Sequence, residues 1–237
     1  MKRIIGSSYL GLAALPLAAL LIGVLLGAPA MAGCSDSPEA GIDWSKCEKR
    51  RLILRDRDLS KGTFVRTDFS RSDLAGAKLA EADLTEANFE HARLAKADLS
   101  RAVLAKSSGD RANFSEALLV GADFSKVEMS RANFTAADFT GANMAKAELG
   151  RSNLSAARLD GADLNHAEIA RAVFAGASLK GTDMTGAYTY LAHFESTDLS
   201  EVKGLTQDQL EAACGNDQTK LPQGLTAPDT WPCGLDD

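Results

Sequence analysis

Large apolar residues recur at every fifth position through most of the chain. From Leu59 to Leu199 this position holds Leu, Phe, Met or Ile, and it departs from that set at Gly109 and Thr189. The residue two places earlier is Ala in most repeats, as at Ala82, and is otherwise nearly always Ser, Thr, Gly or Val. Each repeat therefore offers one bulky and one small side chain to a common interior.

A period of five excludes both regular secondary structures. An α-helix turns by about 100° per residue, so side chains five apart spiral around it and build no apolar stripe. In a straight strand an odd spacing sends successive large residues to opposite faces. The remaining solution is a chain that turns a corner about every five residues and stacks on itself as a flat-sided coil.

The other three positions of each repeat are polar or small. Asp, Asn or Glu precedes the large residue, Ser, Thr or Ala follows it, and Lys, Arg or Gly occupies the corner. The runs at 81–85, 121–125 and 161–165 read Glu-Ala-Asp-Leu-Thr, Gly-Ala-Asp-Phe-Ser and Gly-Ala-Asp-Leu-Asn. These runs resemble the repeat of the pentapeptide repeat proteins, and the resemblance extends over roughly residues 52–203.

The resemblance implies an all-β fold, a right-handed quadrilateral parallel β-helix with four pentads per coil and about seven coils. At about 4.8 Å per stacked strand, such a rod would be about 35 Å long. A repeat of this kind specifies architecture and leaves function to the surface.

The N-terminal segment has the features of a secretion signal. Lys2 and Arg3 precede an apolar run over 9–26, and Ala30-Met31-Ala32 offers a small-x-small cleavage site. We expect a signal peptide at 1–32, an N-terminal cap at 33–53, the β-helix at 54–203 and a C-terminal helical or loop cap at 204–237. The mature protein would then be periplasmic or secreted, with an uncleaved membrane anchor as the alternative.

Four cysteines flank the repeat and none lies inside it: Cys34, Cys47, Cys214 and Cys233. In an exported chain an even count indicates disulfides, and pairing within each flank is the simplest of three connectivities. Cys34 also ends an imperfect lipoprotein box, so acylation there is an alternative that would anchor the protein to a membrane. Acylation would leave Cys47 unpaired, and the spacing does not fit a zinc site.

Both flanks resemble the terminal segments of exported pentapeptide repeat proteins and have the composition of end caps. Thr206 and Gln209 have capping-box spacing, which predicts a short helix that Gly215 can end. We interpret Tyr188 and Tyr190 as residues that pack in this cap against Trp231 or Leu210, with an aromatic platform for sugars as the alternative.

Positions twenty apart would stack on one edge of a four-pentad coil, and basic residues occupy one such column. The predicted anion-binding ladder consists of Arg71, Arg111, Arg131, Arg151 and Arg171, with His91 in the same column. Guanidinium groups at this spacing suit a repeating anion. The competing interpretation, which we favour at this stage, is neutralisation by the nearby column of Glu128, Glu148 and Glu168, because exposed pairs of this kind contribute little.

The sequence offers little to catalysis or to cofactors. It has three histidines in all, and nucleophile elbows, phosphate loops and zinc-protease helices are absent from it. The column of Asp123, Asn143, Asp163 and Asp183 could suggest calcium, but local charge balance explains it with fewer assumptions. Gly109 could leave a void or an outward bulge in the coil. We therefore predict no enzyme activity, no cofactor and no metal.

These features predict a non-catalytic exported solenoid with a binding or scaffold role in the bacterial cell envelope. Its partner is unknown, and an envelope protein, a glycan or an anionic lipid surface are the candidates, while nucleic acid is not expected. The alternative rests on the resemblance alone: some cytoplasmic pentapeptide repeat proteins mimic DNA and bind type II topoisomerases such as gyrase. The net charge of −6 fits that alternative in outline.

Overall fold

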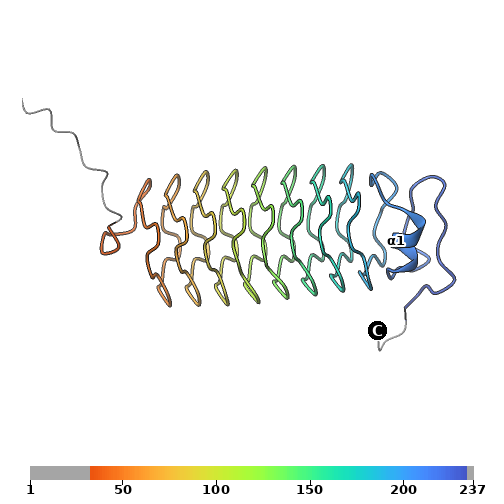
Figure 1. Cartoon of the computed structure of the whole chain (residues 1–237), viewed down its shortest axis with the longest axis horizontal. Helices are drawn as coiled ribbons and strands as arrows, with labels where there is room; N and C mark the ends of the chain where they lie inside the picture. The colour runs from red at the N-terminus through yellow and green to blue at the C-terminus, as the bar shows by residue number, and fades with distance from the viewer. Residues whose placement is uncertain (1–32, 234–237) are drawn as a thin grey trace, which may run out of the picture. The chain divides into compact units, whose positions relative to one another are not determined.

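The computed structural model describes residues 33–233, and the predicted signal peptide at 1–32 therefore lies outside the described residues. The described chain winds into a stacked coil that is closed at its C-terminal end by helix α1, Gln207–Glu211 (Figure 1). As far as Lys203 its β contacts are single parallel bridges between residues twenty apart, such as Asp123 with Asn143. Four pentads thus make one coil, and each residue lies directly above its counterpart in the next.

A membrane-spanning helix is not found among residues 33–233, because none of their helices has the length and apolar character that a bilayer requires.

All five backbone N–H groups of a regular pentad find hydrogen-bond acceptors. Asp123 donates its N–H to the preceding coil at 3.0 Å, and Phe124 and Lys126 donate theirs to the following coil at 2.7 and 3.0 Å. The Ala122 N–H bonds back across the corner at 3.1 Å. The fifth N–H, that of Ser125, donates to the Asp123 Oδ1 atom at 3.0 Å. An Asp or Asn before the large residue is therefore what caps the N–H two places later.

The corners require a left-handed backbone. Lys126 has φ 56° and Arg131 has φ 57°, and corner residues elsewhere in the coil share this conformation. A left-handed φ is unusual for residues other than glycine. Here most corner N–H groups are hydrogen-bonded to the next coil, as Arg131 is to Gly150 O at 2.9 Å, so the stack holds the strained residues in place.

The interior is lined as the five-residue period predicts. The large residues and the small residues two places earlier are almost all inaccessible to solvent. Phenylalanine rings stack between coils, and the ring centroids of Phe114 and Phe134 are 5.3 Å apart. Burial of one such side chain contributes on the order of 2 kcal/mol, so the column of them stabilises the coil.

The irregular repeat at Gly109 forms neither an empty void nor a bulge. Its β-bridge partners and backbone hydrogen bonds follow the regular pattern. Carbons and the sulfur of Met129, one coil later, lie 3.3 Å from where a Cβ of Gly109 would be. The flexible methionine therefore fills the space that the glycine leaves.

The coil begins earlier than residue 54, inside the segment predicted as a cap. Asp43 already bridges to Thr63. Trp44 and Lys49 occupy the large interior positions of this first coil, and both are buried. Because Trp and Lys stand where Leu, Phe, Met or Ile would be expected, the five-residue pattern does not identify the pentads that contain them. Cys47, at a small interior position, is disulfide-bonded to Cys34 and ties residues before the coil to it.

At the other end, α1 interrupts the twenty-residue register. Thr206 and Gln209 form the capping box, and Leu210 is fully buried. The side-chain Nε2 of Gln209 donates to two carbonyls of the last coil, Met184 O at 3.1 Å and Ala187 O at 2.7 Å. After α1 the chain returns to the coil, where Cys214 bridges to His193.

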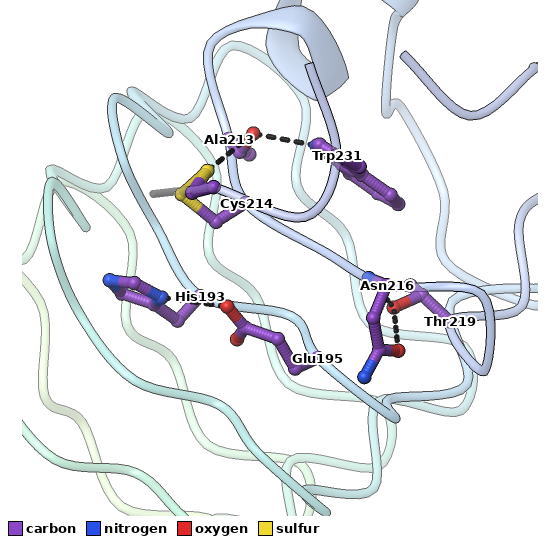
Figure 2. The surroundings of a disulfide bond; sticks show 8 residues. His193, Glu195, Ala213, Cys214, Asn216, Thr219 and Trp231 are labelled. Atoms are coloured by element: carbon purple, nitrogen blue, oxygen red, sulfur yellow. Dashed lines mark hydrogen bonds and ion pairs between the residues drawn. A yellow bond between two sulfur atoms is a disulfide. The ribbon is translucent and has the colours of Figure 1, made fainter. Parts of the chain in front are cut away.

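The C-terminal segment is fastened to this last coil by a disulfide between Cys214 and Cys233 (Figure 2). The indole Nε1 of Trp231 donates to Ala213 O at 2.7 Å. Gly215 does not end α1, which finishes at Glu211. Instead, a Cβ at Gly215 would lie 2.3 Å from the Trp231 ring, so the glycine makes room for the indole.

Candidate functional site: a grooved side with an arginine rail

One of the four sides of the coil is hollowed along its length. We call it the grooved side, and in successive coils it comprises 48–51, 68–71, 88–91, 108–111, 128–131, 148–151, 168–171 and 188–191. Three depressions of about 480, 410 and 250 Å³ follow one another on it. The first two share Asn88 and Glu90, and the last two share Ser130 and Arg131. The depressions therefore form one track parallel to the axis of the coil.

The predicted arginine column lies along one edge of this side. We call it the Arg rail, and it comprises Arg71, Arg111, Arg131, Arg151 and Arg171, with His91 between the first two. All six residues are corner residues with φ between 55° and 60°. Their backbone N–H groups bond to the following coil, so the side chains are anchored at the spacing of the coils, about 4.8 Å.

The glutamate column does not neutralise the Arg rail, and the interpretation that we favoured from the sequence is wrong on this point. Arg131 and Arg111 each contact one carboxylate, that of Asp110, at 3.4 and 3.8 Å. Among residues 33–233, Arg151 and Arg171 have no carboxylate within 4.0 Å. At its C-terminal end the rail therefore carries positive charge without an ion-pair partner.

The glutamates form a second rail on the same side. Glu128, Glu148 and Glu168 are bridged in succession, so their side chains stack. Partial burial, and then repulsion from Glu168 and Glu128, raises the pKa of Glu148 above its ordinary value. A raised pKa is the expected result when stacked carboxylates lack a cation to pair with them.

The floor between the rails presents backbone donors. In pentads with Asp or Asn before the large residue, that side chain accepts the N–H two places later, as Asn133 does for Thr135 at 3.0 Å. Five successive coils on the grooved side have Ser, Glu or Tyr there instead, and those side chains do not make this bond. The N–H groups of the floor residues have no acceptor within the described part of the chain: Asp110, Ser130, Gly150, Ala170 and Tyr190.

These floor N–H groups are directed out of the coil, because in capped pentads the same N–H meets an outward side chain. The floor carbonyls, in contrast, are occupied: Gly150 O accepts from Arg131 at 2.9 Å and Ala170 O accepts from Arg151 at 2.8 Å. The floor therefore offers a row of donors and no matching row of free acceptors.

Two tyrosines close the C-terminal end of the groove. Tyr188 and Tyr190 are 55% and 45% exposed and stack on each other with ring centroids 6.3 Å apart. Among residues 33–233 neither ring pairs with that of Trp231, and both side chains are about half exposed, whereas the predicted packing against Leu210 stays a prediction. Arg171 lies over the Tyr190 ring, 5.7 Å from its centroid. The last depression is lined by Ser130, Arg131, Gly150, Arg151, Ala170, Arg171 and Tyr190.

The other predicted groups lie away from this groove. Cys34 pairs with Cys47 and Cys214 with Cys233, at the two ends of the coil. In the aspartate column, Asn143 Nδ2 donates to Asp123 Oδ1 at 3.1 Å. Residues 33–233 contain no cluster of three His, Cys, Asp or Glu residues arranged to hold a metal ion.

Sequence reasoning identified the Arg rail and missed the floor donors. Their signal is present in the sequence, since five consecutive coils lack Asp or Asn at the same position, from Ser108 to Tyr188. The consequence becomes visible only with the hydrogen bond that these residues fail to make.

Comparison with known proteins supports the architecture. The family model "Pentapeptide repeats" matches residues 54–90, 82–108, 110–151 and 147–186. The crystal structure of HetL, a pentapeptide repeat protein involved in heterocyst differentiation regulation in the cyanobacterium Nostoc, is 26% identical in sequence. It matches with a TM-score of 0.54, covering 80% of this chain and 90% of that one.

Two further structures are similar in part. QnrB1, a plasmid-mediated fluoroquinolone resistance protein, is 17% identical with a TM-score of 0.43, covering 82% of this chain and 88% of that one. A pentapeptide repeat protein from the Arabidopsis thaliana thylakoid lumen is 30% identical with a TM-score of 0.28, covering 59% of this chain and 69% of that one. The search among curated proteins gave no match.

Proposed function

The chain belongs to the pentapeptide repeat family and has its right-handed quadrilateral β-helix, and from this premise we propose a non-catalytic, exported binding element of the cell envelope. The observation that carries the proposal is the groove along one side of the coil, edged by an Arg rail whose last members have no carboxylate partner in the described part of the chain. A rigid rod with evenly spaced polar groups suits an extended partner better than a small, enclosed substrate.

Export is the second part of the proposal and rests on the sequence. The apolar run and small-residue site before Gly33 have the form of a cleaved signal. The disulfides Cys34–Cys47 and Cys214–Cys233 fit an oxidising compartment such as the periplasm. With Cys34 held in a disulfide, its thiol is not available for acylation, which favours a released protein over a lipoprotein.

A DNA mimic that binds a type II topoisomerase is the weaker candidate. Such mimicry needs a continuous negative face. The Arg rail crosses every coil of the grooved side from Arg111 to Arg171, and Lys126 and Lys146 occupy the corner beside the Asp123 column. Inhibition of gyrase by the purified protein would favour this candidate over ours.

The proposed function is tested in two steps. Crosslinking in intact cells, followed by mass spectrometry of the captured neighbours, should recover envelope components and mature protein that begins near Gly33. Replacing Arg131 and Arg151 by Glu should abolish retention of the purified protein on envelope material. Recovery of cytoplasmic neighbours alone, or retention unchanged by the double replacement, would contradict the proposal.

A further inference from the structure

The C-terminal part of the grooved side combines three kinds of group that no single structural need explains. Within residues 33–233, Arg151 and Arg171 carry charge without a carboxylate partner, the floor offers N–H donors without an acceptor, and Tyr190 presents a half-exposed ring at the end. The interior of the coil is complete without any of them. Their coincidence in one depression of about 250 Å³ calls for a ligand with matching chemistry.

We propose that this depression binds a short stretch of an acidic oligosaccharide, whose carboxylates lie along the Arg rail and whose terminal sugar ring packs against the exposed part of the stacked Tyr188–Tyr190 pair. This inference rests on the proposed function and names the class of ligand that the grooved side takes. Each coil supplies one guanidinium and one neighbouring backbone N–H, so one carboxylate per coil receives two kinds of donor. Successive coils are about 4.8 Å apart, so the Arg rail offers evenly spaced sites to a repeating anion.

A peptide strand fits this groove poorly. Strand addition requires both free N–H and free C=O groups along the edge that receives the strand. The floor has free N–H groups but no matching free C=O groups, because Gly150 O and Ala170 O already accept hydrogen bonds from the backbone N–H groups of Arg131 and Arg151. An oligosaccharide that carries carboxylate oxygens along its length offers hydrogen-bond acceptors to these N–H donors.

A lipid surface also fits poorly. The donors lie at the bottom of a depression edged by the Arg rail, where a flat layer of headgroups would meet the long side chains of Arg131 and Arg151 before it reached Gly150. An oligosaccharide is narrow enough to enter. Its hydroxyl groups would find acceptors in the carboxylates of Glu148 and Glu168 on the opposite edge.

The Glu148 position provides a discriminating pair of variants. Glu148→Asn should cap the Gly150 N–H as Asn133 caps that of Thr135. It removes a negative charge near the ligand and yet should weaken binding severalfold, since a floor donor is lost. Glu148→Gln removes the same charge without capping, so binding should be unchanged or tighter. Simple electrostatics would instead make both variants bind more tightly.

The experiment is calorimetric titration of the disulfide-bonded protein, residues 33–237, with trigalacturonate. The fully methyl-esterified trisaccharide, which has the same rings without the charges, should bind at least about tenfold more weakly. Arg151→Gln should weaken binding of the acid by about tenfold, and Tyr190→Ser severalfold. The test is completed by the two Glu148 variants, of which Glu148→Asn should bind trigalacturonate more weakly than Glu148→Gln.

Three results would overturn the inference: equal affinity for the acid and its ester, tightening by both Glu148 variants, or binding of polyphosphate or anionic vesicles in place of trigalacturonate. The proposed function has a separate failure. Binding of trigalacturonate by a protein that crosslinks to cytoplasmic neighbours would remove the envelope role and keep the ligand. Envelope neighbours without trigalacturonate binding would keep the role and remove the ligand.

Discussion

The Nζ atom of Lys49 lies 3.5 Å from the centroid of the Trp44 ring and donates a 2.6 Å hydrogen bond to the carbonyl oxygen of Cys34. Lys49 occupies a position that holds Phe, Met, Leu or Ile in most later coils, and it is 6% exposed. Burial lowers its pKa, while Asp36 acts in the opposite direction. The charged group thus closes the first coil by joining an indole ring to the segment before it.

Lys49→Ala should lower the free energy of unfolding by about 2 kcal/mol, because it removes the buried stem, the contact with Trp44 and the bond to Cys34. Lys49→Met keeps the volume and should lose less than Lys49→Ala. Chemical denaturation measures both. Lys126→Ala, at an exposed corner, is the control and should stay within about 0.5 kcal/mol of the parent. Equal losses for Lys49→Ala and Lys126→Ala would show that Lys49 does not fasten this end.

The buried hydroxyls of Ser72 and Ser107 should respond differently to the same change. Ser72 Oγ donates to Lys49 O at 2.5 Å and accepts the Leu52 N–H at 3.0 Å. Ser107 Oγ is buried and has no partner in the described residues. Ser72→Ala should cost about 1 to 2 kcal/mol. Ser107→Ala should be neutral or stabilising, because Ala fits this position and no bond is lost. Thermal unfolding of both variants checks the order, and a larger loss for Ser107→Ala would reverse it.

Met129 should matter more than an ordinary interior methionine because it also fills the space beside Gly109. Met129→Ala would join its own vacated volume to that of the glycine, so it should cost about 1 kcal/mol more than Met144→Ala, with both losses in the range of about 2 to 5 kcal/mol. Met144 is the matched control, since it is equally buried and its column neighbours Phe124 and Leu164 are large. Equal losses for the two variants would mean that Met129 does not compensate for Gly109.

Glu148→Gln should stabilise the protein at neutral pH and not in acid. In the folded protein the pKa of Glu148 is raised above its ordinary value of 4.5. A carboxyl with a raised folded pKa costs stability at pH values above that pKa and costs nothing below the ordinary value, where it is protonated in both states. The gain should be a few tenths of a kcal/mol because the side chain is only slightly buried and solvent screens the repulsion. Denaturation at pH 7 and at pH 3 measures it, and an equal gain at both would contradict the stacked-carboxylate explanation.

Much of the coil could be predicted from the sequence because its interior repeats. The alternation of Ala137 and Phe139 with polar neighbours is enough to require a corner in every pentad, and both residues are fully buried. The first coil was missed because Trp44 and Lys49 hide the period. A lysine can replace Leu in an interior only where a carbonyl and an aromatic ring receive its charge, and those contacts depend on the chain before it.

The site was predicted in part for a similar reason. The Arg rail follows from the twenty-residue spacing alone, whereas its lack of carboxylate partners does not. Whether Glu148 reaches Arg151 depends on the width of the side of the coil, which no pattern of residue types records. The exposure of Tyr188 and Tyr190 was missed because the α1 segment contacts this side at Thr189 and Leu191 and leaves the two rings about half exposed.

The most direct test of the account is a map of backbone amide chemical shifts for the isotopically labelled protein, residues 33–237, titrated with trigalacturonate. We predict that the largest changes fall on the floor donors, at Ser130, Gly150, Ala170 and Tyr190, and that they saturate together. Chemical-shift changes confined to another side of the coil would contradict this binding site. So would the absence of any change with trigalacturonate, the same result as with its methyl ester.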